Sequence, residues 1–426
     1  MFRKISTNLL ATITIFLIVS INVYFQFRTG IDSPKFGDSG HYLAAAQAIY
    51  NSEEYPRLTQ GWPFFRAPGY PYLISTIWQI TAYDSILALK MFNSICMGLL
   101  ALGIYLLARR IMSQNFAIIG AVLGTLNPFV FSQSLEVSTE TTTAVIFIYF
   151  IYFLTNSEFK TKGLLLGILI TGLTLIRPEY LFILVVSLVF YYSFTSFNLR
   201  KLIIPILFVA LSLNFWGLAN KKATGSYMPL TNATSFHLWF GSSEFVYNNY
   251  PLEFQDTTKF SKKQFNHMVS EMEVVKEKYA FKTTVSDIPR QSEAWFNEFR
   301  LNVEKDKLNY VKNLFVKTAI FWRPFLNPSA YGPNLVWASF VILIPLMLFS
   351  FIGYIHAIRS RIFRSEVIAI TNCLIVLTII HALQIPDFRY RVPVQLPVLA
   401  LFTAYFLSIA IRSTLAKITS KWISLK

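Results

Sequence analysis

The sequence predicts a mainly α-helical, polytopic membrane protein of about ten spans with one small extracytoplasmic domain, and two observations support this fold class. Of the 426 residues, 54% are hydrophobic and only 14% are charged, whereas a soluble domain carries about a quarter charged residues. The apolar residues also gather into runs long enough to cross a bilayer core about 30 Å thick. This composition excludes an ordinary cytosolic enzyme and a disordered chain. It also excludes a disulfide scaffold, because both cysteines lie inside apolar runs.

Ten apolar runs are predicted to form membrane-spanning helices, and the third to fifth of them are short. Their boundaries are Leu9–Phe27, Ile86–Leu107, Phe116–Phe131, Thr142–Leu154, Gly163–Ile176, Glu179–Phe197, Leu202–Ala219, Leu335–His356, Val367–Leu383 and Pro393–Ile411. A further run, Tyr70–Thr81, is too short to span and carries Pro71 near its start. We expect this run to form a short helix at the membrane interface.

Half of the acidic residues lie in one segment, because eleven of the 22 Asp and Glu residues fall between residues 220 and 333. We therefore divide the chain into an N-terminal membrane module (1–219), an extracytoplasmic soluble domain (220–333) and a C-terminal membrane module (334–426). Apolar residues recur with a helical period near the end of the polar segment, so we expect a helical part from about Ser261 to Phe321.

Basic residues indicate the orientation of the chain, since cytoplasmic loops carry an excess of Lys and Arg. With the N-terminus in the cytoplasm, fifteen of the 38 basic residues fall in cytoplasmic loops and tails, and only eight lie outside both these and the polar segment. The net charge of +16 then reflects topology, and no nucleic-acid partner is expected. We expect a multi-pass membrane protein whose polar segment faces the extracytoplasmic side.

The remaining charged residues gather at the predicted outer ends of the spans. The outer loops read FGDSGHYLAAAQAIY, FFRAPGYPYLI, NPFVFSQSLEVSTET, IRPEY and QIPDFRYRVP. They contain Asp38, Arg66, Glu136, Glu140, Arg177, Glu179, Asp387, Arg389 and Arg391. Charged groups so close to hydrocarbon are costly and are usually kept for function. Arginines suit a phosphate and a carboxylate suits activation of a hydroxyl, so a lipid-linked phosphosugar would use both.

The motifs, in this order, resemble the bacterial GT-C fold glycosyltransferases, which are relatives of protein O-mannosyltransferases and of the lipid A aminoarabinose transferase. The resemblance begins with GDSGHYLAAAQAIY followed by FRAPGYP. It continues with the Thr139–Glu140 pair, the Arg177–Pro178 pair, Lys317 ahead of FWRP, and the late RYRVP that begins at Arg389. It extends from about residue 38 to residue 412 and so covers most of the chain.

The resemblance implies an inverting, glycosyltransferase family 39-like enzyme that uses a polyprenyl-phosphate sugar. It also implies a bacterial or archaeal inner (plasma) membrane, with the active site on the extracytoplasmic side. Asp38 would be the general base, and Glu140 would orient the base or the acceptor. Substrate contacts would come from Tyr42, Arg66, Tyr70, Glu136, Arg177, Lys317, Arg389 and Arg391. The outer loops contain no D-x-D or E-x-D pair, and Glu136 with Glu140 would make a thin site for a hard cation. We therefore expect no metal and no cofactor.

Three of these residues also have purely structural interpretations. Asp38 precedes a helix-like run and fits an N-cap. Glu140 fits an acid that is favoured at a helix N-terminus. Arg177 fits a side chain that snorkels from the end of a span to water.

Other function classes stay open beside the transferase. A transporter or flippase of a lipid-linked sugar tends to place ionisable residues near the bilayer midplane, whereas acids are nearly absent from these spans. A polymerase or ligase of surface polysaccharide differs from the transferase only in its acceptor. The expected partners are a polyprenyl-phosphate-linked donor, an acceptor that is a lipid, a glycan or a protein, and the lipid bilayer.

Overall fold

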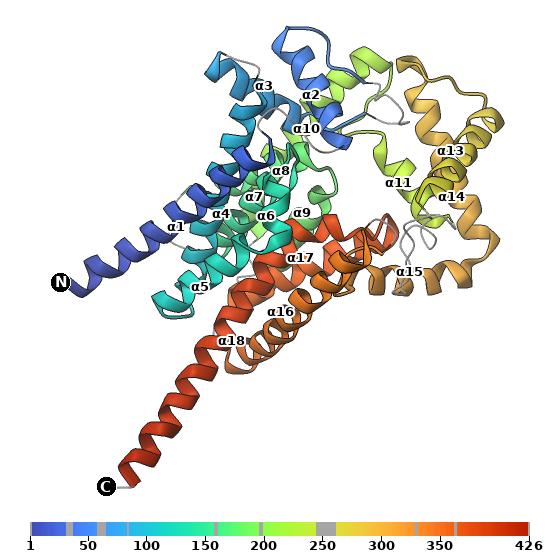
Figure 1. Cartoon of the computed structure of the whole chain (residues 1–426). Coiled ribbons are helices and arrows are strands. Elements are labelled where there is room, and N and C mark those ends of the chain that lie inside the picture. The colour runs from blue at the N-terminus through green and yellow to red at the C-terminus, as the bar shows by residue number, and fades with distance from the viewer. Residues whose placement is uncertain are drawn as a thin grey trace.

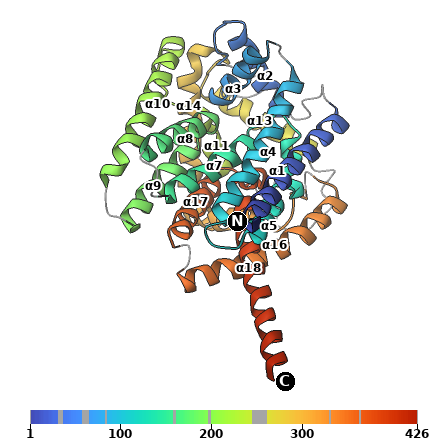
Figure 2. The ribbon, with the colours of Figure 1, turned by 90° about the vertical axis from the view of Figure 1, so that its left-hand side faces the viewer.

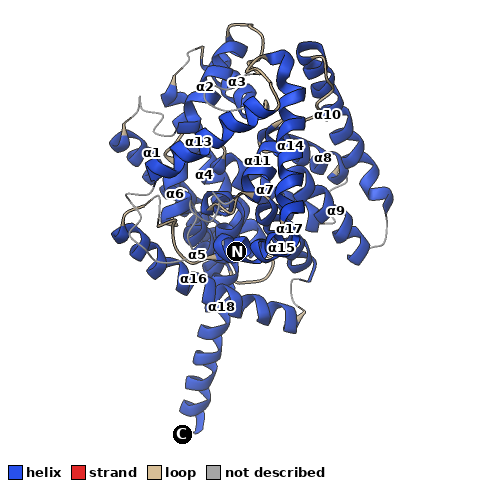
Figure 3. Ribbon diagram, turned by 90° about the vertical axis from the view of Figure 1, so that its right-hand side faces the viewer, coloured by secondary structure: helices blue, strands red, loops and turns tan. Residues whose placement is uncertain are grey.

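The computed structural model describes residues 2–30, 37–57, 65–82, 85–156, 161–195, 199–243, 261–328, 331–361 and 364–424. Every regular element in these ranges is a helix, and Figure 3 accordingly shows only helices and loops in the described part of the chain. The predicted fold class, a mainly α-helical polytopic membrane protein, is confirmed.

Each of the ten predicted runs is mostly helical where the structure describes it. The helices long and apolar enough to cross a membrane are α1 (Phe2–Thr29), α4 (Ile86–Ala108), α10 (Ile203–Thr224) with the short 3-10 helix η1 (Leu199–Leu202) before it, α16 (Pro333–Ser360), α17 (Arg364–Leu383) and α18 (Phe388–Ser424). Three shorter apolar helices are α7 (Glu140–Thr155), α8 (Lys162–Ile176) and α9 (Tyr180–Thr195).

The third predicted run is a broken helix rather than one straight span. It consists of α5 (Gln114–Thr125) and α6 (Pro128–Ser134), which are bent by 60° relative to each other. The side chain of Asn127 accepts a hydrogen bond of 3.0 Å from the backbone N–H of Phe129, so Asn127 caps α6. Pro128 occupies the first turn of α6, where its missing N–H costs nothing. The Asn–Pro pair therefore ends one helix and starts another.

The last helix begins earlier than the apolar run predicted. Helix α18 starts at Phe388, five residues before Pro393, because the carboxylate of Asp387 accepts a hydrogen bond of 2.9 Å from the backbone N–H of Arg389. Arg389 and Arg391 consequently lie on a helix and not in a loop. Residues two apart on a helix do not share a face, so the two guanidiniums diverge.

The remaining helices lie outside the long spans. They are α2 (Gly37–Tyr50), α3 (Gly69–Thr81), α11 (Ala233–Ser242), α13 (Ser261–Lys278), the 3-10 helix η2 (Val285–Asp287), α14 (Ile288–Lys305) and α15 (Lys307–Trp322). Helix α3 coincides with the run expected at the membrane interface. The described part of the polar segment is helical, and α11, α13 and α14 share a small aromatic core in which the rings of Trp239 and Trp295 lie 4.6 Å apart.

The two chain termini and the short helices of the outer loops lie at opposite ends of the helix bundle (Figure 1). The N- and C-termini lie on one side of the molecule, while α2, α3, α11, α13 and α14 lie on the opposite side (Figure 1). Figure 2 shows α18 carrying the C-terminus far beyond the bundle. At the terminal end, Arg110 pairs with Glu366 at 2.6 Å, and Lys162 and Lys201 both lie over the ring of Tyr192. Loop ends predicted to share the cytoplasmic side thus come together.

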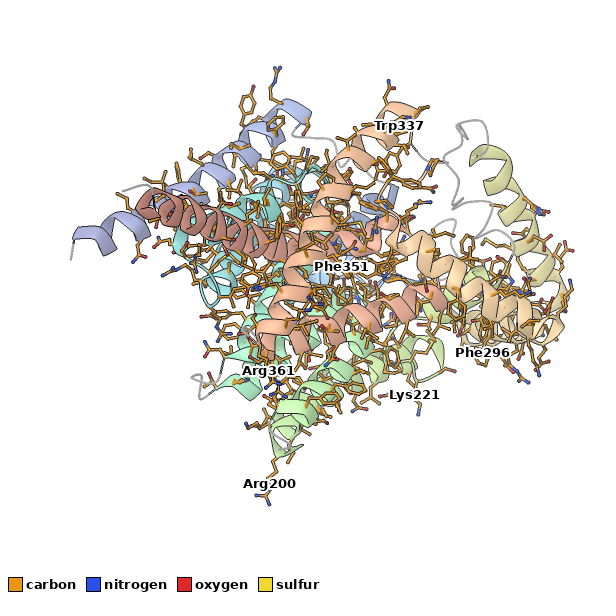
Figure 4. The ribbon with its side chains drawn as sticks, turned by 90° about the horizontal axis from the view of Figure 1, so that it is seen from below. Arg200, Lys221, Phe296, Trp337, Phe351 and Arg361 are labelled. Carbon is orange, nitrogen blue, oxygen red and sulfur yellow. The ribbon has the colours of Figure 1, made fainter. Side chains whose placement is uncertain are left out.

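Large apolar side chains cover the outside of the bundle. Phe16 on α1, Phe215 on α10 and Phe351 on α16 are 70%, 71% and 62% exposed, and Figure 4 shows Phe351 on the surface of α16, between Trp337 and Arg361. Such a surface is typical of contact with lipid. Inside, the helices pack through a continuous apolar core.

Candidate active site

A cavity of about 430 Å³ opens at the end of the bundle where α2 and α11 lie. It is lined by side chains from α2, the segments before α3 and after α8, α11, the end of α17 and the start of α18. We call it the site cavity, and its polar walls are Asp38, Tyr42, Arg66, Thr139, Arg177, Glu179, Thr231, Thr234, His237, Gln384, Arg389 and Tyr390. Apolar side chains from several segments also line the cavity, and those from α17 are Val376, Ile379, Ile380 and Leu383.

Six ionised side chains form a row of alternating charge along the polar wall. The row runs Arg66, Asp38, Arg389, Glu140, Arg177 and Glu179. Arg66 and Arg389 donate to the two carboxylate oxygens of Asp38 at 2.5 and 2.8 Å. The Nε of Arg389 also donates to Glu140. Positive and negative charges are balanced in this row, so each buried group has an opposite partner, as buried charges require.

The inner half of the row is more deeply buried than the outer half. Glu140 is only 1% exposed, and it lies 3.6 Å from Arg177, which donates to Glu179 at 2.9 Å. Asp38, by contrast, keeps 24% of its side chain exposed. Glu140 therefore holds two arginines from behind, while Asp38 faces the cavity.

Two local features place Asp38 and Arg66 against the rest of the row. The hydroxyl of Ser39 donates a hydrogen bond of 2.8 Å to the carbonyl of Val137, which ties the start of α2 to the segment before α7. At Gly69, a Cβ atom would lie 2.6 Å from the carbonyl carbon of Leu175 and 2.8 Å from the backbone nitrogen of Ile176. Only glycine allows this approach, which brings the Arg66 segment beside the end of α8.

Opposing influences act on the Asp38 carboxyl. Burial alone raises the pKa of Asp38, but the guanidiniums of Arg389 and Arg66 lower it by more, so the pKa lies below its ordinary value. Asp38 is therefore ionised at neutral pH and can accept a proton, although the two arginines make it a weak base while they hold it. Both carboxylate oxygens of Asp38 accept hydrogen bonds from these arginines, so Asp38 does more than cap a helix.

Aromatic rings orient the arginines of the site cavity. The guanidinium of Arg66 lies 5.5 Å from the ring of Tyr42, and that of Arg177 lies 5.1 Å from the ring of Tyr390. The ring of Tyr390 is also stacked on His381, with centroids 4.8 Å apart. Stacking of this kind restricts the side chains to one orientation.

Five of the ten predicted site residues line the site cavity: Asp38, Tyr42, Arg66, Arg177 and Arg389. Glu140 lies directly behind them in the charge row. Tyr70 is buried behind Tyr42, with ring centroids 5.1 Å apart.

The structure does not bring Glu136, Lys317 or Arg391 into the lining of the site cavity. The backbone carbonyl of Glu136 accepts from the side chain of Asn93. Arg391 is buried and donates to the carbonyl of Arg323, because its position two residues after Arg389 turns it to another face of α18.

Lys317 is also buried and does not line the cavity, although two of its hydrogen-bond partners do. Its ammonium group donates to the carbonyls of Gly241 at 2.8 Å, Leu383 at 3.3 Å and Gln384 at 3.5 Å. Burial lowers the pKa of Lys317 to about 7. The side chain thus connects α15 to the ends of α11 and α17 instead of facing a ligand.

His237 and Tyr390 line the cavity but were not singled out from the sequence as site residues. Tyr390 sits inside the RYRVP motif, whereas a lone histidine on α11 carries no spacing signal. Burial, the largest influence, lowers the pKa of His237 to about 4, so His237 is neutral at physiological pH. Within the described residues, no group of three His, Cys, Asp or Glu side chains is placed to hold a metal ion.

Part of the sequence matches one protein family, and the structure is similar in fold to solved structures of an oligosaccharyltransferase. Residues 65–217 match the family described as dolichyl-phosphate-mannose-protein mannosyltransferase. The structure is similar to the oligosaccharyltransferase of Archaeoglobus fulgidus in its apo form, with 14% identity and a TM-score of 0.53 over 97% of this chain and 52% of that chain.

A second structure of the Archaeoglobus fulgidus oligosaccharyltransferase AglB, in complex with an inhibitory peptide and a dolichol-phosphate, matches with 14% identity and a TM-score of 0.50. That match covers 96% of this chain and 51% of the other. The chain thus spans about half the length of these enzymes. No curated protein matches it. At this identity the structural likeness concerns the fold, and together with the family match it confirms the resemblance to the GT-C type.

Proposed function

We propose that this chain, a membrane protein with the GT-C fold, is a glycosyltransferase that moves a sugar from a polyprenyl-phosphate donor to an extracytoplasmic acceptor with inversion. The observation that carries the proposal is the position of Asp38. Its ionised carboxylate lies between two arginines in a cavity that is also lined by apolar side chains of α17, a helix long and apolar enough to cross a membrane. A base, cations for a phosphate and a surface for a lipid are thus combined in one site.

The arginines of the cavity would hold the donor phosphate. Arg66, Arg177 and Arg389 line the site cavity and come from three separate parts of the chain. Guanidiniums bind phosphate oxygens through charge-assisted hydrogen bonds. Ile379, Ile380 and Leu383 on α17 would contact the first isoprene units of the carrier. Arg391 and Lys317 are not part of this proposal, because neither lines the cavity.

Donor binding would also activate the base. Arg66 and Arg389, which lower the pKa of Asp38, are the groups that a phosphate would attract. Each hydrogen bond that moves from the carboxylate to the phosphate frees an oxygen of Asp38 and raises its pKa toward the ordinary range. Asp38 would therefore become a better base only when the donor is in place.

The transfer step follows from these positions. The acceptor hydroxyl gives its proton to Asp38 while its oxygen attacks the anomeric carbon from the face opposite the phosphate. The bond between the anomeric carbon and the phosphate oxygen breaks, and polyprenyl phosphate leaves with its negative charge on the arginines. Glu140, buried behind Arg389 and Arg177, would be a positioning residue that holds both guanidiniums in place.

A flippase for a lipid-linked sugar is the alternative from another class. The charge row lies at one end of the bundle, where α2 begins and α8 ends, and this one-sided placement favours surface chemistry over transport. That the site faces the extracytoplasmic side is part of the proposal, and so is transfer of the sugar to an acceptor on that side.

The test uses full-length protein in proteoliposomes with a panel of polyprenyl-phosphate hexoses and pentoses that carry a radiolabel in the sugar. The proteoliposomes also receive envelope lipids, glycans and proteins of the producing cells as acceptors. A transferase moves the labelled sugar to one of these acceptors, which breaks the sugar–phosphate bond and releases unlabelled polyprenyl phosphate. A flippase moves intact donor across the bilayer without cleaving it. Transbilayer movement of uncleaved donor, with the wild-type rate in Asp38→Asn, would favour the flippase and sink the proposal.

A further inference from the structure

Two apolar grooves flank the site cavity on different sides. One, of about 650 Å³, lies between α16, α17 and α18 and shares Ile379 with the cavity; we call it the α17 groove. The other, of about 590 Å³, is bordered by α3, α4, α7, α8 and α10 and shares Ile176 with the cavity; we call it the α3 groove. Both volumes fall within the roughly 300–1,000 Å³ typical of ligand pockets.

The α3 groove has the chemistry of a lipid-chain site. Its lining is almost entirely apolar and includes Tyr72, Phe92, Leu175, Phe215 and Trp216. Helices α4 and α10 are long apolar helices, and α8 packs against both α10 and α3. The groove therefore lies at the level of the bilayer. Tyr72 and Phe215 at its edge are 48% and 71% exposed, so the groove is open to the lipid phase.

One end of the α3 groove is lined by residues that are close in sequence to Arg66 and Arg177. Pro68 and Gly69 line the groove and follow Arg66 by two and three residues, while Arg66 donates to Asp38 at 2.5 Å. Ile176, shared by groove and cavity, immediately precedes Arg177. A chain in this groove would thus bring its polar head to the side of the site cavity that Arg66 and Arg177 line.

We propose that the acceptor is itself a membrane lipid and that its hydrocarbon chain lies in the α3 groove. This inference rests on the proposed function and deepens it. A transferase with a water-soluble acceptor needs one chain site, for the donor, and the α17 groove, which meets the cavity at Ile379 close to Tyr390, supplies it. A second groove at bilayer level, which shares Ile176 with the site cavity, is what transfer from one lipid to another requires.

The bond changes are those of the proposed transfer. The hydroxyl oxygen of the lipid head group bonds to the anomeric carbon, the bond from that carbon to the donor phosphate oxygen breaks, and the hydroxyl proton passes to Asp38. The products are a glycolipid and polyprenyl phosphate, both held by the membrane.

Gly172 gives a clean way to fill the α3 groove. It lines the groove, and a Cβ atom at this position would meet no atom within 4 Å. Gly172→Phe should therefore occupy the groove without disturbing the packing of α8. Ile168→Phe is the matched control, because Ile168 lies one turn earlier on the same face of α8, is 46% exposed and does not line the groove.

The first measurement detects the lipid without requiring catalysis. Full-length protein is placed in vesicles of phosphatidylethanolamine and phosphatidylglycerol that contain a diazirine-bearing palmitoyl phosphatidylethanolamine, and photolabelled peptides are mapped by mass spectrometry. We expect labelling of the peptides that contain Tyr72 and Trp216 in wild type and in Ile168→Phe. In Gly172→Phe this labelling should fall at least roughly tenfold. The new ring would displace about two methylenes of the lipid chain from the groove, and each buried methylene contributes a factor of about four to the binding affinity. Equal labelling in both variants, or none in the groove of wild type, overturns the inference.

The second measurement identifies the product. Proteoliposomes receive labelled polyprenyl-phosphate sugar and the membrane lipids of the cells that produce the protein. The inference predicts a new organic-soluble labelled species that survives the mild acid that cleaves the donor, with a KM for the lipid acceptor raised in Gly172→Phe but not in Ile168→Phe. Transfer of the label to water-soluble glycan or to protein overturns the lipid acceptor while leaving the transferase intact. Absence of donor cleavage counts against the proposed function, and the photolabelling result then decides on the groove.

Discussion

Arg389 at the start of α18 donates a hydrogen bond of 2.8 Å to the carboxylate of Asp38 at the start of α2, across 351 positions of the chain. This contact joins the first and last parts of the molecule at one point. It also explains why the pKa of Asp38 lies below its ordinary value although burial acts to raise it. The proposed base is therefore held in its ionised form by the cations that the proposed donor would occupy.

The two arginines of the RYRVP motif should behave differently. Arg389→Lys cannot reach both Asp38 and Glu140, and the loss of one charge-assisted bond of about 1.5–3 kcal/mol should lower kcat/KM about 10- to 100-fold. Arg391→Met removes the donor to the carbonyl of Arg323, and neither residue lines the cavity. It should cost about 1–3 kcal/mol of stability while the folded fraction keeps its activity. Equal loss of activity per folded molecule in both variants would contradict this assignment.

The pH dependence of the rate should report the charges around Asp38. In the free enzyme its pKa is lowered, so kcat/KM should show no fall due to Asp38 until the pH drops below the ordinary carboxyl value of about 3.9. Removing a cation raises the pKa, so Arg66→Gln should move this acid limb to higher pH. The acid limb of kcat, which reports the donor complex, should also lie higher than that of kcat/KM. An acid limb that moves to lower pH in Arg66→Gln would refute the electrostatic account.

Gly69 should tolerate no side chain. A Cβ there would meet backbone atoms of Leu175 and Ile176 at 2.6–2.8 Å, and backbone cannot move aside as a flexible side chain can. Gly69→Ala should cost about 1–3 kcal/mol, the usual range for overpacking, and should raise the KM of the donor by displacing Arg66. The control is Gly40→Ala on α2, where a Cβ meets nothing within 4 Å and helix propensity favours alanine by up to about 1 kcal/mol. The unfolding temperature measured in detergent should therefore fall in Gly69→Ala and rise in Gly40→Ala, each relative to wild type.

Lys317 should make the free energy of unfolding depend on pH between about 7 and about 10. Burial lowers its pKa in the folded protein to about 7, against about 10.4 in the unfolded chain. Between these values the unfolded state binds the extra proton, so this residue's contribution to stability rises with pH from about 7 to about 10 and is constant below about 7. The difference in unfolding free energy between wild type and Lys317→Met should follow that slope. A difference independent of pH would show that the ammonium stays charged in the fold.

Much of the fold was predictable because the membrane constrains it strongly. Long apolar runs such as Ile86–Leu107 must become helices in lipid, and the structure has α4 there. The gathering of Asp38, Arg66, Arg177 and Arg389 was predictable as well, since each follows or precedes a run at the same expected end of the bundle.

Helix phase and tertiary contacts were not predictable from the same pattern. The sequence shows two arginines around Tyr390, but only the start of α18 at Phe388 decides that Arg389 faces the cavity and Arg391 does not. The resemblance implies a substrate contact at Lys317, yet its three carbonyl partners belong to residues 66 to 76 positions away in the sequence. Asn127 and Pro128 together indicate a helix break in the third run. The apolar residues on both sides of the pair predicted one continuous span instead.

The most direct test of the account is the rate of sugar transfer by Asp38→Asn. Asparagine keeps the size of the side chain and caps a helix about as well as aspartate, but it cannot accept the acceptor proton. The measurement is transfer from labelled polyprenyl-phosphate sugar by reconstituted protein whose folding and donor binding match wild type. The account predicts a rate lowered about 100- to 10,000-fold, the usual share of general-base catalysis. A near-normal rate in Asp38→Asn would contradict the central claim that this carboxylate is the base.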